Sequence, residues 1–291
     1  MLRKFFLLVG LTVMCVGLWF YFQPIANELY VKYNAEKTIK TFVKVSDKYK
    51  DLKKEIEEYN QSIYENGQKD FRDAWSVQQS PIELKGFDDN VFGYIRIPKM
   101  DVKLPLYLGA TNENMEKGAV ILGQTSIPIG GKNTNSVIAA HRGYHGAPYF
   151  REIEKIDKGD KVIIKNPWGK LYYTVESIAI IPPNDNDSVK IQEGRDMITL
   201  MTCHPYRSHG KFRYLVYCVR SGEKMNSNIV EKTERINTTG TKFVSSEYDI
   251  RRENLVRIIA CVAIAFIILM VIISLIREAR DNRKKKRNKH S

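Results

Sequence analysis

The chain has 291 residues and a formal net charge of +13, which is enough length for one domain with a sizeable core plus appendages. Its four cysteines are too few for the disulfide framework of a small secreted domain, and they lack the clustered His/Cys spacing of a zinc site. Much of the positive charge lies at the C-terminus, so the rest of the chain is only mildly basic and nucleic-acid binding has little support.

Two long apolar segments flank the chain. Phe5–Phe22 is uncharged, follows Arg3 and Lys4, and ends in aromatic residues; no small-x-small cleavage site follows it. We therefore predict an uncleaved signal-anchor over 1–22 and a second transmembrane helix over 255–276. The tail, 277–291, carries eight Lys or Arg. By the positive-inside rule both termini are expected in the cytoplasm, with the residues between the spans on the outer side of the cell membrane.

The segment 23–85 is expected to be an extracellular helical region. Apolar residues such as Ile39, Phe42 and Val43 recur at three- and four-residue steps between Lys and Glu, which is typical of an amphipathic helix. A partner-binding coiled coil is the alternative, but the heptads are poor.

From 86 to 222 the pattern changes to short runs rich in Val, Ile and Tyr, separated by Gly, Pro and Asn turns. Such runs predict a mainly β domain, either a sandwich or a barrel. The runs are "VFGYIRIP", "KLPLYLG", "NSVIAAH", "KVIIKNP", "KLYYTVESIAII", "MITLMTC" and "FRYLVYCVR". The polar, turn-rich stretch 223–254 is predicted to be a linker to the second span.

Cys203 ends one of these runs and is followed by His204 and Pro205, where a strand is expected to stop. The residue alone leaves four roles open: a packed core thiol, a disulfide partner of Cys218, a metal ligand, or a nucleophile.

Two other residues favour the nucleophile. His141 ends another strand-like run and could supply acid or base function to a thiol. Arg213 begins the last run, where a guanidinium can stabilise a developing oxyanion. Rival histidines in loop-like stretches are His145, His204 and His209.

The stretch "TLMTCHPY…R" resembles the TLxTC…R signature of sortases, the cysteine transpeptidases of Gram-positive cell surfaces. The stretches "GYIRIPKMDVKLPLYLGA", "SIPIGGKNTNSVIAAHRG" and "YFREIEKIDKGDKV" are similar to class C, the pilus-assembling group. The resemblance implies a mainly β fold, a closed barrel of about eight strands, with an N-terminal helical region and two flanking transmembrane helices.

Carried over to this chain, the resemblance makes Cys203 the nucleophile, His141 the catalytic histidine and Arg213 the catalytic arginine. Thr202 lies where the family contacts the sorting signal. Class C members also carry a lid with an Asp-Pro-aromatic motif, its acid near the arginine and its ring over the cysteine. Here Asp73 and Trp75 match that motif, whereas Ala74 replaces the proline and leaves φ free.

The chain departs from the pattern in the loop after the cysteine. The spacing from Cys203 to Arg213 is about one residue longer than in many class C members, and Arg207 and Lys211 are alternative cations. His204 replaces the Thr that class C members often carry; its ring either perturbs the thiol or faces solvent, and we expect it to face solvent.

The resemblance implies cleavage of an LPxTG-like sorting signal of surface proteins or pilins between Thr and Gly. A thioacyl-enzyme then passes the acyl group to an amine, either a pilin lysine or a cell-wall precursor. The alternatives are a housekeeping sortase that attaches proteins to peptidoglycan and an inactive, membrane-tethered scaffold. We expect no cofactor and no nucleic-acid partner. We also expect no metal site, and the acidic turn 182–188 is not an exception.

Overall fold

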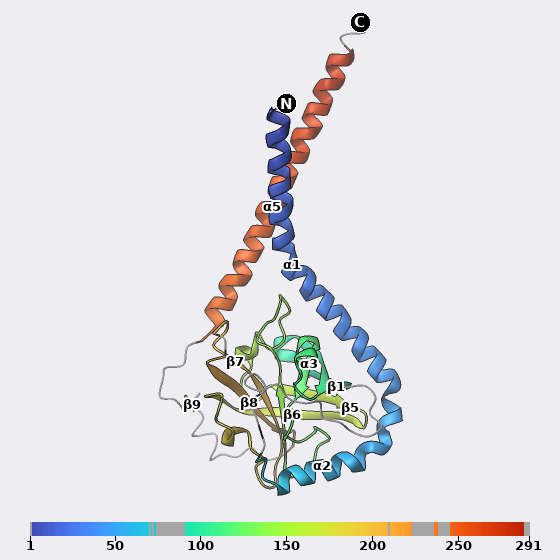
Figure 1. The fold of residues 1–291 in the computed structure, drawn as a ribbon, viewed down its shortest axis with the longest axis vertical. Helices are drawn as coiled ribbons and strands as arrows, with labels where there is room; N and C mark the ends of the chain where they lie inside the picture. Colours follow the sequence, from blue (N-terminus) through green and yellow to red (C-terminus); the bar gives the residue numbers. More distant parts are fainter. Residues whose placement is uncertain are drawn as a thin grey trace. The chain divides into compact units, whose positions relative to one another are not determined.

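The computed structural model describes residues 2–69, 71, 73, 91–208, 210–222, 236–237 and 245–287. These fall into two compact units, Met1–Ser245 and Ser246–Ser291. The first unit opens with three consecutive helical segments, α1 (Leu2–Val45), the 3₁₀ segment η1 (Ser46–Leu52) and α2 (Lys53–Glu65) (Figure 1). The helical region predicted before the β domain is therefore confirmed, with a 3₁₀ segment in its middle.

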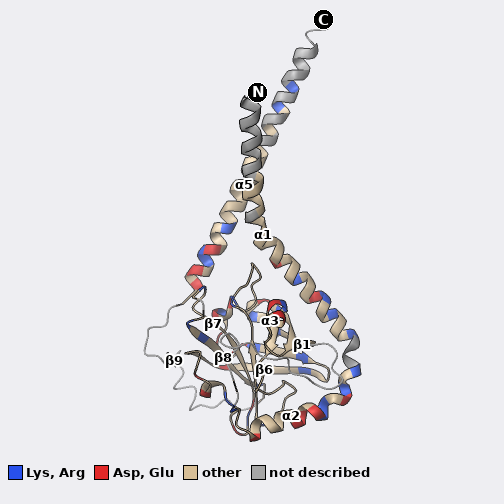
Figure 2. Cartoon of the chain, in the orientation of Figure 1, with Lys and Arg blue, Asp and Glu red and all other residues tan. Residues whose placement is uncertain are grey.

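The predicted amphipathic pattern is also present in these helices. Ile39 and Phe42 are buried, whereas Val43 is 52% exposed, so the apolar stripe is narrower than the sequence suggested. On α2 the other face carries the i,i+4 ion pairs Lys53–Glu57 and Lys54–Glu58, so both basic and acidic side chains lie on this helix (Figure 2).

The strands that follow close into a barrel. They run in the order β5-β1-β2-β3-β4-β7-β8-β6, and a further pairing of β5 with β6 joins the two ends, so the predicted closed eight-stranded barrel is confirmed. The pairs β2/β3 and β4/β7 are parallel and the others antiparallel. The strand bounds are β1 Val91–Ile97, β2 Val102–Leu108, β3 Ala119–Ile121, β4 Thr134–Ala139, β5 Lys161–Asn166, β6 Gly169–Ile181, β7 Asp196–His204 and β8 Phe212–Arg220.

Short helical segments connect several of these strands. They are η2 (Pro98–Met100), α3 (Asn112–Lys117), η3 (Ile153–Lys155) and η4 (Asp187–Val189). A two-residue turn at the predicted "NPWGK" hairpin joins β5 to β6, with Asn166 paired to Gly169.

The barrel strands are buried on both faces, because one hydrophobic cluster fills the interior and a second covers part of the outside. On β7, Ile198 and Leu200 belong to the first cluster, whereas Met201 belongs to the second. On β8, Val216 and Leu215 divide in the same way. This alternation follows from the two-residue period of a strand, and it fixes which face each site residue occupies.

Three features of the fold differ from the sequence prediction. The three-residue strand β3 was missed because it is too short to show an alternation. A two-residue strand, β9 (Ile236–Asn237), pairs with β6 inside the predicted linker. In the second unit, α5 (Glu247–Arg287) begins inside that linker and continues into the predicted tail.

Within the described residues, one helical stretch is long and apolar enough to cross a bilayer, Glu247–Met270, with a mean hydropathy of 2.2 in its most apolar window. The N-terminal span over Phe5–Phe22 stays a prediction.

Candidate active site

The end of β7 presents Cys203 directly opposite Arg213 on β8. The antiparallel register pairs these two residues, so their side chains leave the sheet on the same face. On the other side of β7, the parallel register with β4 aligns Ala139 with Met201. The chain that leaves β4 therefore passes beside Cys203 two residues later, at His141.

Thr202 fastens β7 to that segment. Its side chain is fully buried, and its hydroxyl donates a 2.7 Å hydrogen bond to the backbone oxygen of Ala140. Thr202 thus links the end of β7 to the end of β4 through a hydrogen bond. Its contact with a sorting signal stays a prediction.

Arg213 is held mainly by Asp73, from the segment after α2. Nε and Nη2 of Arg213 each donate a 2.6 Å hydrogen bond to one carboxylate oxygen of Asp73. Both residues are buried, at 3% and 6% exposed, so the pair is a bidentate ion pair shielded from solvent. The structure brings Asp73 to the arginine, whereas Trp75, the other predicted lid residue, lies outside the described residues.

The remaining nitrogen of Arg213 reaches the cysteine side. Nη1 lies 3.9 Å from Sγ of Cys203 and donates a 2.7 Å hydrogen bond to the backbone oxygen of Gly210. Gly210 has φ +76°, and a Cβ built on it would lie 2.9 Å from that Nη1 and 3.2 Å from Sγ. Glycine at this position therefore lets the β7–β8 loop approach the thiol and the guanidinium closely.

Burial raises the pKa of the Cys203 thiol to about 11; Asp73 adds to this, whereas the positive charges of Arg213 and Arg142 oppose it. The thiol is consequently protonated at neutral pH in the resting structure. Cys203 and Cys218 are both free, and Cys218 is fully buried in the barrel interior, so the disulfide alternative is not realised in this structure.

His141 lies in a cluster of aromatic rings. Its imidazole stacks on Tyr144, with ring centroids 4.5 Å apart, and meets Tyr149 edge-on at 6.1 Å. Burial lowers the pKa of the imidazole, with Glu116 opposing and His145 adding to the effect. Histidine and cysteine are thus both neutral at rest, and in the described part of the chain no hydrogen bond joins them.

The expectation that His204 faces solvent is wrong. The residue is 2% exposed, because β7 continues through it and the strand period turns its ring to the face opposite Cys203. There it packs against Tyr214, with ring centroids 5.6 Å apart. Its Nδ1 lies 2.9 Å from Nη1 of Arg142, and burial next to that cation lowers the pKa of the imidazole to about 4.

The rival cations and histidines lie elsewhere. Arg207 stacks over Tyr206 at 5.4 Å, and Lys211 precedes β8. His145 packs edge-on against Tyr144, whereas His209 lies outside the described residues. Cross-strand register therefore distinguishes Arg213 from the other cations, a signal that sequence spacing alone did not carry. The described residues hold no cluster of His, Cys, Asp or Glu suited to a metal ion.

Residues 95–221 match the family model of the Sortase domain. Sortase A of Staphylococcus aureus is 31% identical over 160 residues, which cover 54% of this chain and 74% of that protein. The chain belongs to the sortase family, whose members are cysteine transpeptidases. Sortase A of Bacillus anthracis is 28% identical over 157 residues, 53% of this chain and 72% of that protein.

Solved sortases share the fold. A crystal structure of Streptococcus agalactiae sortase C1 is 28% identical and has a TM-score of 0.58, covering 66% of this chain and 100% of that one. Sortase C of Streptococcus pneumoniae is 31% identical with a TM-score of 0.53, covering 63% and 96%. The two solved neighbours named here are thus sortases C, whereas the two curated relatives named here are sortases A.

Proposed function

We propose that this chain is a membrane-anchored sortase of the class C type. It cleaves an LPxTG-like sorting signal and transfers the resulting acyl group to an amine, for which we propose a pilin lysine. The observation that carries the proposal is the pairing of Cys203 with Arg213 at the ends of β7 and β8, with the carboxylate of Asp73 on the guanidinium.

In the first half-reaction His141 accepts the proton of the Cys203 thiol, and the thiolate attacks the carbonyl carbon of the Thr–Gly bond. Arg213 stabilises the resulting oxyanion, since Nη1 already lies 3.9 Å from Sγ. The imidazolium then returns its proton to the Gly nitrogen. The C–N bond breaks, the Gly-bearing amine leaves, and a thioester on Cys203 remains.

In the second half-reaction an acceptor amine attacks the thioester and gives its proton to His141. The C–S bond breaks, Cys203 leaves as a thiolate, and His141 returns the proton to it. Because Asp73 occupies Nε and Nη2 of Arg213 at rest, its segment must move before those two donors can face substrate.

Asp73 supports the class C assignment, because the family resemblance implies a lid carboxylate near the arginine. The likeness to sortases named C in two streptococci favours the same class. A housekeeping function is the second candidate, favoured by curated relatives named sortase A. A pilin-like substrate separates them, since covalent ladders indicate polymerisation and single attachment to cell wall indicates anchoring.

The apolar stretch Glu247–Met270 supports a C-terminal membrane anchor. Together with the N-terminal apolar run over Phe5–Phe22 it favours two spans, with 86–222 as the external catalytic domain and both termini in the cytoplasm.

The nucleophile is tested with full-length protein in detergent and a sorting-signal peptide. Wild type is expected to form a covalent adduct at Cys203 that mass spectrometry resolves, and Cys203→Ala is expected to form none. An undiminished adduct in Cys203→Ala would contradict the assignment of Cys203 as the nucleophile. Native alkylation of Cys203 tests the inactive-scaffold alternative, because an inert, inaccessible thiol resists the reagent.

A further inference from the structure

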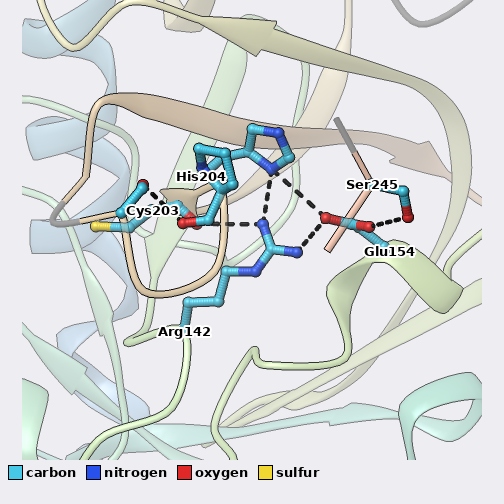
Figure 3. A network of polar contacts seen from close by, with 7 residues as sticks. Arg142, Glu154, Cys203, His204 and Ser245 are labelled. Atoms are coloured by element: carbon cyan, nitrogen blue, oxygen red, sulfur yellow. Dashed lines mark hydrogen bonds and ion pairs between the residues drawn. The ribbon is translucent and has the colours of Figure 1, made fainter. Parts of the chain in front are cut away.

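Arg142, the residue after His141, is buried at 5% exposed and lies in a polar network beside the nucleophile (Figure 3). Its Nη1 donates to the backbone oxygen of Cys203 at 3.3 Å and to Nδ1 of His204 at 2.9 Å. Its Nη2 donates to Oε1 of Glu154, on η3, in a short ion pair. One guanidinium thus contacts the nucleophile's own peptide group and two further side chains.

The network approaches Cys203 from the face of β7 opposite the thiol. Cys203 and Arg213 share one face, whereas His204 and Tyr214 share the other, by the alternation along each strand. The Arg142 guanidinium lies on this second side, 5.6 Å from the Tyr214 ring. Arg142 therefore acts on Cys203 through the backbone oxygen of the cysteine and through its own positive charge, and it does not face the substrate.

The polarity of the network follows from its donors. An arginine can only donate, so Nδ1 of His204 must be the nitrogen without a proton, and the neutral ring carries its proton on Nε2. The pKa of His204, near 4, agrees with a neutral ring. The 3.5 Å approach of that Nδ1 to Glu154 is then not an ion pair, and Glu154 pairs with Arg142 instead. The outer oxygen of Glu154 accepts a 2.9 Å hydrogen bond from Ser245.

We propose that Arg142 is a positioning residue of the transpeptidase site: its guanidinium, held by Glu154 and His204, fixes the peptide group of Cys203 relative to the His141 segment and keeps a positive charge near the thiol. The proposal rests on Cys203 being the nucleophile.

Arg142 is suited to this task because it joins the two elements that carry the reacting groups. Its backbone follows His141 directly, and its side chain bonds to the carbonyl of Cys203, so one residue links the end of β4 to the end of β7. Small displacements between nucleophile and base lower catalytic rates steeply. The neighbouring charges that act on the thiol are Arg213 and Asp73 on its own face and Arg142 behind it.

The test uses full-length protein in detergent and follows two quantities. The first is the pH dependence of Cys203 alkylation by iodoacetamide, read on the Cys203 peptide by mass spectrometry because other thiols also react. The second is kcat and KM for thioacyl formation from a sorting-signal peptide. The variants are Arg142→Gln, Arg142→Lys and Glu154→Gln. Arg195→Gln is the matched control, because Arg195 forms a similar pair with Glu176 at the opposite end of β7, 2.8 and 2.9 Å from its two oxygens.

Arg142→Gln is expected to raise the alkylation midpoint by about one pH unit, since it removes a nearby positive charge. It is expected to lower kcat about tenfold or more with KM unchanged, since it releases the Cys203 peptide without touching substrate. Arg142→Lys keeps the positive charge, so its alkylation midpoint should lie close to that of wild type. Its kcat should remain below the wild-type value, because lysine cannot reproduce the hydrogen bonds of the guanidinium. Glu154→Gln is expected to move the midpoint the opposite way, downward, because the Arg142 charge is then uncompensated. Arg195→Gln should change neither quantity.

A folded Arg142→Gln with the wild-type midpoint and kcat overturns the proposal. If Arg142→Gln does not fold, Glu154→Gln provides the test through the direction in which its alkylation midpoint moves. A Glu154→Gln midpoint that is equal to or higher than that of wild type overturns the proposal. Failure of the proposed function looks different, because wild type would then form no adduct with the sorting-signal peptide, or Cys203→Ala would form it as well as wild type. An inactive Cys203→Ala beside an unaltered Arg142→Gln overturns the role of Arg142 alone.

Discussion

Replacing Asp73 by Asn is expected to make the Cys203 thiol about tenfold more reactive. The carboxylate lies 2.6 Å from Nη2 of Arg213, whose Nη1 lies 3.9 Å from the sulfur. These contacts put the Asp73 charge about 7 Å from the thiol, where an effective dielectric constant of about 20 gives a repulsion of about 2 kcal/mol with a thiolate. Removing it should lower the thiol pKa from its value of about 11 by roughly one unit or somewhat more.

The assay is alkylation of full-length protein over a range of pH. At pH 7.5 a thiol with a pKa of 11 is about 0.03% thiolate, and a decrease of one unit raises that fraction to about 0.3%. The rate at neutral pH should rise by the same factor. Asp187→Asn is the matched control, because Asp187 is exposed on the surface and pairs with Lys190.

The pH profile of alkylation distinguishes an effect of the Asp73 charge from a change in access of the reagent to Cys203. A lower pKa moves the midpoint, whereas a loosened Asp73 segment raises the rate at every pH without moving it. Asp73→Asn also leaves the buried Arg213 without its anionic partner, so the free energy of unfolding should fall by about 3 kcal/mol. A midpoint equal to wild type would refute the electrostatic argument, and an upward shift would refute its sign.

Three other substitutions test the site. Gly210→Ala forces a side chain onto a residue with φ +76°, 2.9 Å from Nη1 of Arg213, and should lower thioacyl formation at least about tenfold in a kinetic assay; wild-type kinetics would contradict the close approach. Thr202→Val removes a buried 2.7 Å hydrogen bond and should reduce the free energy of denaturant unfolding by about 1–3 kcal/mol, whereas an unchanged value would show that the tie contributes nothing. His204 has a pKa of about 4 when folded against an ordinary value of 6.5, so the unfolded chain binds its proton first as pH falls. Stability should therefore drop by about 2–3 kcal/mol between pH 7 and 4, and His204→Gln should flatten that slope; an equal slope in both proteins would exclude His204 as its source.

The barrel was predictable from sequence where its strands are long enough to alternate. All seven runs read as strands are strands, because they are rich in β-branched and aromatic residues, whose side chains suit a pleated surface. The order of strands around the barrel was not predictable from these runs alone, since it depends on pairings between distant segments such as β4 with β7. The short strand β3 depends on those neighbours and carries no pattern of its own.

The Asp73–Arg213 pair shows a second limit. A carboxylate in an irregular polar segment gives no sign of its partner, and family resemblance alone suggested this arginine. The structure shows a buried, bidentate pair between residues 140 positions apart in sequence. Contacts of that range are set by how the helical region packs on the barrel, which local pattern does not encode.

His204 was misjudged although the sequence held the needed signal. Treating His204–Pro205 as the start of a loop suggested an exposed ring, yet the same run had placed Cys203 on a strand end open to substrate. In a strand, a residue whose neighbour faces the site must face the opposite side, so an accessible Cys203 already implied an inward His204. An inward imidazole requires a hydrogen-bond partner, and Arg142 in the His-Arg-Gly stretch is the donor that the structure supplies. The two-residue period of a strand, applied to the residue after the predicted nucleophile, would therefore have placed the His204 ring on the inward face.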